Sequence, residues 1–184
     1  MLNVVMQLIE EATPRWRRAI DREWPYGPRG DMPGPEAFLS TPIAWAALQR
    51  DFDVFPEASY ESSTERIDFL ARTPEGQMLA LEFKMIGGHG RPNLGGLAQD
   101  SNKLTSFSRS FHDSRISFRG LVVGCWNAQL TDAWRAVTER AEPRSELAES
   151  IEDMLSRYRL QAPRQVWTSP GEQSLHVLVA SLPE

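Results

Sequence analysis

Three charged residues interrupt apolar stretches of the chain in a pattern that could support chemistry. Asp68 lies within Arg66-Ile67-Asp68-Phe69-Leu70, and Glu82 and Lys84 lie within the apolar stretch 78–86. Charges in such stretches cost free energy unless they are paired or bind a metal ion. Two carboxylates and an ammonium on neighbouring strands could hold a divalent cation beside a phosphodiester. The pattern therefore predicts metal-assisted phosphodiester chemistry.

The expected strand geometry brings these groups together. Alternate side chains of a strand share a face, so Glu82 and Lys84 should point the same way while Phe83 packs on the other face. A turn over residues 73–76 can place Asp68 beside them. Asp68 and Glu82 would then bind Mg²⁺, or Mn²⁺ in its place, with the main-chain carbonyl of Phe83 and water completing the shell. The metal would activate the attacking water, and Lys84 would orient that water and offset charge on the phosphorane.

The basic residues carry a second clue. Of the twenty, eighteen are Arg and two are Lys, namely Lys84 and Lys103. Arginine serves well as a surface charge, but its planar fork does not readily give up or share a proton, whereas a lysine ammonium is compact. Against this arginine-rich background, the pattern indicates that Lys84 is present for its chemistry.

Periodicity and turn residues predict the elements that position these groups. Apolar residues at helical spacing predict a helix from residue 2 to about 24, which Pro14 should split or kink, with Thr13 as a new N-cap. Thr41-Pro42 predicts the start of a second helix after a loop over 25–35. Three strands are then expected, and the last two should form a hairpin. Their ranges are 53–60, 66–73 and 77–86.

The second half of the chain continues the alternation. A glycine-rich segment, 87–96, predicts a flexible loop that closes over a substrate or merely connects. The further elements are a helix over 97–111, a fourth strand over 116–126, two helices within 131–159 broken at Pro143, and a closing hairpin over 164–182. The acidic pair of helices is interpreted as a lid or a dimer surface. The predicted class is α/β, with the central order helix, three strands, helix, strand.

This order and these residues resemble the PD-(D/E)XK nuclease superfamily, whose core is the restriction-endonuclease-like fold. That core has an Asp on its second strand and (Glu/Asp)-x-Lys on its third, and the resemblance covers about 36–126. It implies that Asp68 and Glu82 are the metal ligands and that Lys84 is the catalytic lysine. Ile67 stands where the family name has proline, which is a common departure.

The resemblance also points to further site residues. Many members carry another acid on the first helix or first strand, which leaves Glu36 before the predicted helix or Glu57 on the first strand. We prefer Glu57 because it lies closer to the expected metal. The segment Asp100-Ser101-Asn102-Lys103-Leu104 looks like the Asp-x-x-Lys-Leu segment of some members. Lys103 is therefore expected to face the active edge.

The implied function is a Mg²⁺-dependent endo- or exonuclease, with DNA favoured over RNA as the substrate and a homodimer left open. One alternative is a non-catalytic member of the same fold that acts as a nucleic-acid or protein binding module. Another is a surface hairpin whose Glu82 and Lys84 merely form cross-strand pairs in solvent. A third is an unrelated α/β protein, in which Asp68 and Lys84 would lie far apart.

The length and composition restrict the domain organisation and the possible functions. The 184 residues predict a single domain, 1–184, with a core over about 36–126, an N-terminal helical extension (1–35) and a C-terminal helical and hairpin extension (127–184). A net charge of −5 by itself argues against a nucleic-acid partner, but the stretch from Lys84 to Arg119 has six Lys or Arg residues and two acids, so a locally basic face is compatible with the sequence. No apolar run approaches the ~20 residues of a membrane span. A single cysteine excludes an internal disulfide and a multi-cysteine zinc site, and it favours a buried thiol and a cytoplasmic setting.

Overall fold

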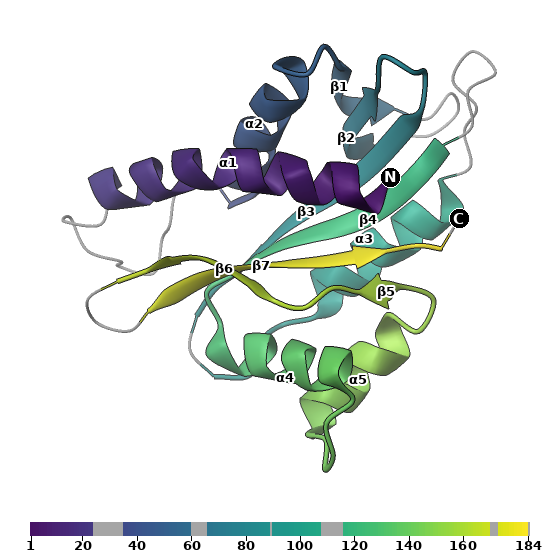
Figure 1. Cartoon of the computed structure of the whole chain (residues 1–184). Helices are drawn as coiled ribbons and strands as arrows, with labels where there is room; N and C mark the ends of the chain where they lie inside the picture. The colour runs from purple at the N-terminus through teal and green to yellow at the C-terminus, as the bar shows by residue number, and fades with distance from the viewer. Residues whose placement is uncertain (24–34, 60–65, 89, 108–115, 170–172, 184) are drawn as a thin grey trace.

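An open sheet of seven strands forms the middle of the described chain, and five helices cover its faces (Figure 1). This computed structural model describes residues 1–23, 35–59, 66–88, 90–107, 116–169 and 173–183. The helices are α1 (Leu2–Glu23), α2 (Pro35–Leu48), α3 (Gly95–Ser106), α4 (Ala128–Glu139) and α5 (Glu146–Met154). The strands are β1 (Asp53–Ser59), β2 (Arg66–Arg72), β3 (Met78–Ile86), β4 (Ile116–Cys125), β5 (Arg159–Leu160), β6 (Arg164–Thr168) and β7 (Ser174–Ser181). The predicted α/β class is confirmed.

The strands follow the order β1-β2-β3-β4-β7-β5, and β6 also pairs with β7. The β1–β2, β2–β3, β4–β7 and β6–β7 pairs are antiparallel, which confirms the predicted hairpin of β2 with β3 and the pairing of the two C-terminal strands. The β3–β4 pair is parallel, and α3 lies in the connection between these two strands. Such a crossover places a helix against the sheet face that its strands share. The two-residue strand β5 was not predicted.

The sheet separates two apolar cores. Helices α1 and α2 pack on one face, together with alternate residues of β3 such as Leu81 and Phe83. Helices α3, α4 and α5 pack on the other face, where Trp134 and Ile151 are buried. The prediction of two helices on either side of Pro143 is therefore confirmed. The apolar side of α4 packs against the sheet, and α5 packs against α4.

Helix α1 runs without interruption through Pro14, so the predicted split at this residue is wrong. A proline inside a helix removes one backbone hydrogen bond and crowds the preceding turn. Here the buried stripe of α1, which includes Leu8 and Trp16, packs against α2 and the sheet. Thr13 does not act as an N-cap, because its hydroxyl donates to the Ile9 carbonyl at 2.8 Å. Tertiary packing therefore outweighs the local cost of the proline.

Helix α2 begins at Pro35, six residues before the predicted start, and it contains Pro42 in its interior. Pro35 occupies the first helical position, which is where proline is favoured. Leu39 and Ile43 lie four residues apart and are both buried against the sheet, so the added turn contributes to the core. The prediction took the wrong proline for the start of the helix. As a consequence, Glu36 lies in the first turn of α2 rather than in a loop.

Strand β1 forms one edge of the sheet and is irregular in its middle. Pro56 pairs with Phe69 and Ala58 pairs with Ile67, which puts Glu57 opposite Asp68 in the register. The φ angle of Glu57 is 50°, however, which lies in the left-handed region rather than in the strand region. The edge strand therefore breaks its regular geometry directly after a proline.

Cys125 is buried at the end of β4, as predicted. Its thiol donates to the Asn127 carbonyl and accepts from the Thr131 hydroxyl. Burial raises the pKa of this thiol, which disfavours the reactive thiolate. Among the described residues, no helix combines the length and apolarity that crossing a membrane requires.

Candidate functional site

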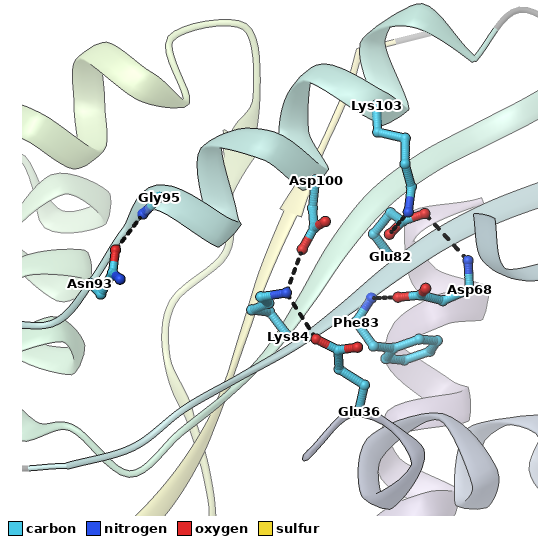
Figure 2. A network of polar contacts seen from close by, with 9 residues as sticks. All are labelled: Glu36, Asp68, Glu82, Phe83, Lys84, Asn93, Gly95, Asp100 and Lys103. Carbon is cyan, nitrogen blue, oxygen red and sulfur yellow. Dashed lines mark hydrogen bonds and ion pairs between the residues drawn. The ribbon is translucent and has the colours of Figure 1, made fainter. Parts of the chain in front are cut away.

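Six charged side chains from four elements meet around β3 (Figure 2). They are Asp68 of β2, Glu82 and Lys84 of β3, Glu36 of α2, and Asp100 and Lys103 of α3. Glu82 and Lys84 face α3, whereas the ring of Phe83 packs edge-on against Phe69 in the opposite core, with 6.1 Å between ring centroids. The predicted division of these β3 side chains between the two faces is confirmed.

Backbone hydrogen bonds across the hairpin hold the side chains of Asp68 and Glu82 in place. The main-chain N–H of Asp68 donates to Glu82 Oε1 at 3.3 Å. In return, the main-chain N–H of Phe83 donates to Asp68 Oδ2 at 2.8 Å. Each carboxylate is thus oriented by the backbone of the other strand. Phe83 enters the site through its N–H, and the metal-ligand role of its carbonyl stays a prediction.

Glu82 is the most buried charged group of the site, with 1% of its side chain exposed. Burial raises the pKa of its carboxyl to about 8; the hydrogen bond from Lys103 opposes this shift, and the charge of Asp68 adds to it. The Lys103 ammonium lies 2.7 Å from Glu82 Oε2. A buried carboxylate next to a second carboxylate favours the approach of a cation. In this structure the ammonium of Lys103 supplies that positive charge.

Lys84 lies between two other carboxylates. Its Nζ is 2.8 Å from Glu36 Oε1 and 3.2 Å from Asp100 Oδ2. Burial alone would lower the pKa of Lys84, but the hydrogen bond to Glu36 and the charge of Asp100 outweigh it and raise the pKa. Burial in turn raises the pKa of the Asp100 carboxyl. Lys84 is therefore held as a charged ammonium.

The contacts between β3 and α3 form a crossed pattern. The strand presents Glu82 and Lys84 two residues apart, and the helix presents Asp100 and Lys103 three residues apart. The acid of the strand meets the lysine of the helix, and the lysine of the strand meets the acid of the helix. The expectation that Lys103 faces the site is confirmed. Both lysines of the chain therefore lie in this cluster.

The structure does not bring Glu57 into this cluster. Its carboxylate forms an ion pair with Arg66 at 2.8 Å on the exposed edge of the sheet. Glu57 lies opposite Asp68 in the register of β1 with β2, but its left-handed backbone departs from strand geometry. Glu36, the alternative, contacts Lys84 instead. The preference for Glu57 is therefore corrected. The sequence analysis missed that Pro35 begins α2, which makes Glu36 a helical residue.

Asp100 is a further site residue that the sequence analysis did not single out for a role. It was visible only as the first position of the Asp-x-x-Lys-Leu segment. Its contact with Lys84 depends on how α3 lies over β3, which a single sequence does not specify.

The donor set fits a hard divalent cation with two carboxylate ligands. Asp68 and Glu82 lie close enough for their charges to interact, and Glu82 already attracts a cationic group. Among the described residues, no group of three or more His, Cys, Asp or Glu side chains is arranged to hold a metal ion. Mg²⁺ commonly uses one or two carboxylates and takes its remaining ligands from water and phosphate oxygens. Asp68 and Glu82 are thus the residues that would hold it.

Hydrogen bonds from Asn127 hold the described part of the glycine-rich segment against the start of α4. The side-chain amide of Asn127 donates to the carbonyls of Gly88 and Gly90, at 3.1 and 2.9 Å. The side-chain oxygen of Asn127 also caps α4 by accepting from the N–H of Leu130. Both glycines have a φ of 87°, which a side chain would disfavour. These contacts favour the connector interpretation of the segment, within which His89 lies outside the described residues.

Comparisons with protein-family models, with curated proteins and with solved structures give no match. The functional argument consequently depends on the residues and geometry of this site.

Proposed function

We propose that this chain is a Mg²⁺-dependent nuclease of the PD-(D/E)XK superfamily, with DNA as the favoured substrate. The observation that carries the proposal is the juxtaposition of Asp68, Glu82 and Lys84, with Glu82 buried and its carboxyl pKa raised to about 8. Groups of this kind are expensive in a sheet interior, and perturbed carboxyls cluster at functional sites. The choice of DNA over RNA comes from the resemblance.

The order of elements supports the same family. The described chain has a helix (α2), three strands (β1–β3), a helix (α3) and a strand (β4), which is the order that the resemblance implies. Asp68 lies on the second of these strands, and Glu82 and Lys84 lie on the third. Glu36 on the first helix would supply the further acid that many members carry. The restriction-endonuclease-like arrangement is thus part of the proposal.

The roles of the residues follow from their contacts. Asp68 and Glu82, each oriented by a backbone N–H of the opposite strand, would hold the metal ion at a fixed place on the hairpin. When bound, Mg²⁺ supplies polarisation of a phosphate oxygen and activation of the attacking water. The Lys84 ammonium donates to that water or to a phosphate oxygen and offsets the growing negative charge. Lys103 adds a second positive charge on the helix side.

Cleavage of labelled single-stranded and duplex DNA and RNA tests the proposal directly. The purified protein should cut at least one of these substrates with Mg²⁺ or Mn²⁺ and none with EDTA. Asp68→Asn and Lys84→Met should each lower the rate on the order of 10²-fold or more. Glu57→Gln is the matched control, because it makes the same kind of charge removal on the neighbouring edge strand. Cutting that survives EDTA, or that the Asp68 and Lys84 variants retain, would contradict the proposal.

A second candidate is a non-catalytic binding module of the same fold. It is favoured by the internal pairing of the cluster, since Glu82 is matched by Lys103, and Lys84 by Glu36 and Asp100. The two candidates differ in their response to metal. A nuclease should gain thermal stability with Mg²⁺ or Mn²⁺, and Asp68→Asn should remove that gain. A module that binds nucleic acid without the metal, cuts nothing and shows no metal-induced stabilisation would replace the nuclease proposal.

A further inference from the structure

Helix α3 has no side chain at Gly96, and the end of the Lys84 side chain lies against the helix at this position. A Cβ atom at Gly96 would lie 2.7 Å from Lys84 Cε and 3.4 Å from its Nζ. Separations below about 3 Å between carbon atoms are strongly repulsive, since carbon atoms at their best packing distance are about 3.5 to 4.0 Å apart. Any residue other than glycine at position 96 would displace the end of the Lys84 side chain. The lysine thus runs directly over the helix backbone at this point.

The same helix also provides a carboxylate for the end of that lysine. Asp100 follows Gly96 by four residues, so both lie on the same side of α3. Its Oδ2 is buried and lies 3.2 Å from Lys84 Nζ. A buried carboxylate oxygen is costly unless a cation or a hydrogen-bond donor faces it. The Lys84 ammonium is the cation that Asp100 faces.

We propose that Gly96 and Asp100 form a cradle that positions the Lys84 ammonium to donate to the attacking water or to a phosphate oxygen of the phosphodiester. This inference rests on the proposed nuclease function, in which Lys84 is the catalytic group, and it makes Gly96 and Asp100 positioning residues. Gly96 fixes the path of the lysine side chain, and Asp100 fixes the place of its ammonium.

The two carboxylates around Lys84 have different surroundings. The Glu36 side chain is 43% exposed, whereas the Asp100 side chain is 12% exposed. An ammonium has three N–H donors, so contacts with these two carboxylates leave one donor for a water or a phosphate oxygen. Glu36 lies on the solvent side of the ammonium, from which a substrate would approach. Asp100 stays on the protein side and keeps the ammonium in place.

Gly96→Ala separates positioning from stability. Alanine is a better helix former than glycine, and the atom that its methyl group would meet is near the end of a flexible side chain, so the variant should still fold. Its methyl group should move the end of Lys84, since that is the flexible partner in the contact. A misplacement of about 1 Å at a reacting centre can cost on the order of 10²-fold in rate. We expect kcat to fall about 10- to 100-fold with little change in KM.

Gly95→Ala is the matched control. It adds the same methyl group to the same helix one residue earlier, where the nearest atom is Asn93 Oδ1 at 3.2 Å and no atom of Lys84 lies within 4 Å. Asp100→Asn provides a second, independent variant, because it keeps the shape of the side chain and removes the charge. We expect it to lower kcat about tenfold, and its folding should be unimpaired because one buried charge is removed.

The lysine content of the chain allows a direct readout. Lys84 and Lys103 are the only lysines, so protein labelled with ¹³C and ¹⁵N in lysine gives two sets of side-chain NMR signals, which Lys84→Arg assigns. Gly96→Ala and Asp100→Asn should each shift the Cε and Nζ signals of Lys84 more than those of Lys103. Gly95→Ala should shift neither.

Together the spectra and the rates decide the proposal. A shifted Lys84 signal with a lowered kcat in both cradle variants, and neither change in Gly95→Ala, supports it. An unshifted Lys84 signal, or a shifted one with wild-type kcat, overturns the positioning role while the nuclease function stands. A wild-type protein that cuts no nucleic acid overturns the nuclease function and the positioning role together.

Discussion

Two ion pairs, one between β1 and β2 and the other between β3 and α3, have nearly equal lengths and very different surroundings. Arg66 and Glu57 meet at 2.8 Å on the edge, with side chains that are 61% and 71% exposed. Lys103 and Glu82 meet at 2.7 Å, with side chains that are 19% and 1% exposed. An exposed pair contributes about 0–1 kcal/mol, whereas a buried pair has a desolvation cost that can exceed its attraction. The distance between the charged atoms therefore does not distinguish a solvated pair from a desolvated one, whereas the burial of the side chains does.

Removing one partner of the buried pair should have the largest effect on stability. At a pH above about 8, where Glu82 is ionised, Lys103→Met should lower the free energy of unfolding by about 3 kcal/mol, because it leaves a buried charge without its partner. Urea denaturation measures this change. The double variant Glu82→Gln/Lys103→Met should recover most of the loss. A single variant as stable as the wild type would show that the buried pair differs little from the exposed one.

The buried carboxyl should also make stability depend on pH. The pKa of Glu82 is raised from 4.5 to about 8, so between these values the folded state binds more protons than the unfolded state. The stability contributed by Glu82 is thus complete below about pH 4.5 and is lost as the pH rises through 8. Relative to Glu82→Gln, the wild type should lose free energy of unfolding over this window. Denaturation of both proteins near pH 5, 7 and 9 tests this, and parallel curves would refute it.

The two carboxylates proposed for the further acid should differ in their effect on cleavage. Glu36→Gln keeps an oxygen that can accept from the Lys84 ammonium but removes its negative charge, and we expect it to lower the cleavage rate about tenfold. Glu57→Gln removes a partner of the exposed Arg66, and we expect the rate to stay within about twofold of the wild type. Rates measured side by side on one substrate make the comparison. The reverse order would restore Glu57 as the site residue.

The smallest effect should come from a second exposed pair. Arg72 and Asp53 meet at 2.6 Å on the edge of the sheet, with side chains that are about half exposed. Arg72→Met should change the free energy of unfolding by less than about 1 kcal/mol. The stabilisation produced by Mg²⁺ should equal that of the wild type. A loss comparable to that of Lys103→Met would remove the distinction between the two kinds of pair.

The sequence specified the parts of the site that depend on local geometry. Strand alternation is a two-residue rule, and it placed Glu82 and Lys84 on one face and Phe83 on the other. The turn between β2 and β3 then brought Asp68 alongside Glu82. These contacts could be predicted because few residues separate the partners along the chain or because the turn fixes their register.

The parts that could not be predicted depend on tertiary packing. The start of α2 is set by a turn that buries Leu39 against the sheet, and local signals favoured a later proline. Glu36 and Lys84 are 48 residues apart in the sequence, so nothing local connects them. The fit of Gly96 to Lys84 appears only once α3 lies across β3. Sequence patterns identified Asp68, Glu82 and Lys84 as the centre of the cluster. The packing of α2 and α3 determined that Glu36 and Gly96 lie beside Lys84.

The irregular edge strand has a consequence for how copies of the chain meet in concentrated solution. A regular edge strand offers a row of free backbone groups on which a second copy can extend the sheet, which is a common route to aggregation. In β1, Pro56 has no N–H to offer, and Glu57 has a left-handed backbone conformation that a regular strand does not contain. Arg66 and Arg72 add charge along the same edge. This edge is therefore a poor template for fibril-like growth, so the protein should tolerate the high concentrations that labelling and spectroscopy demand.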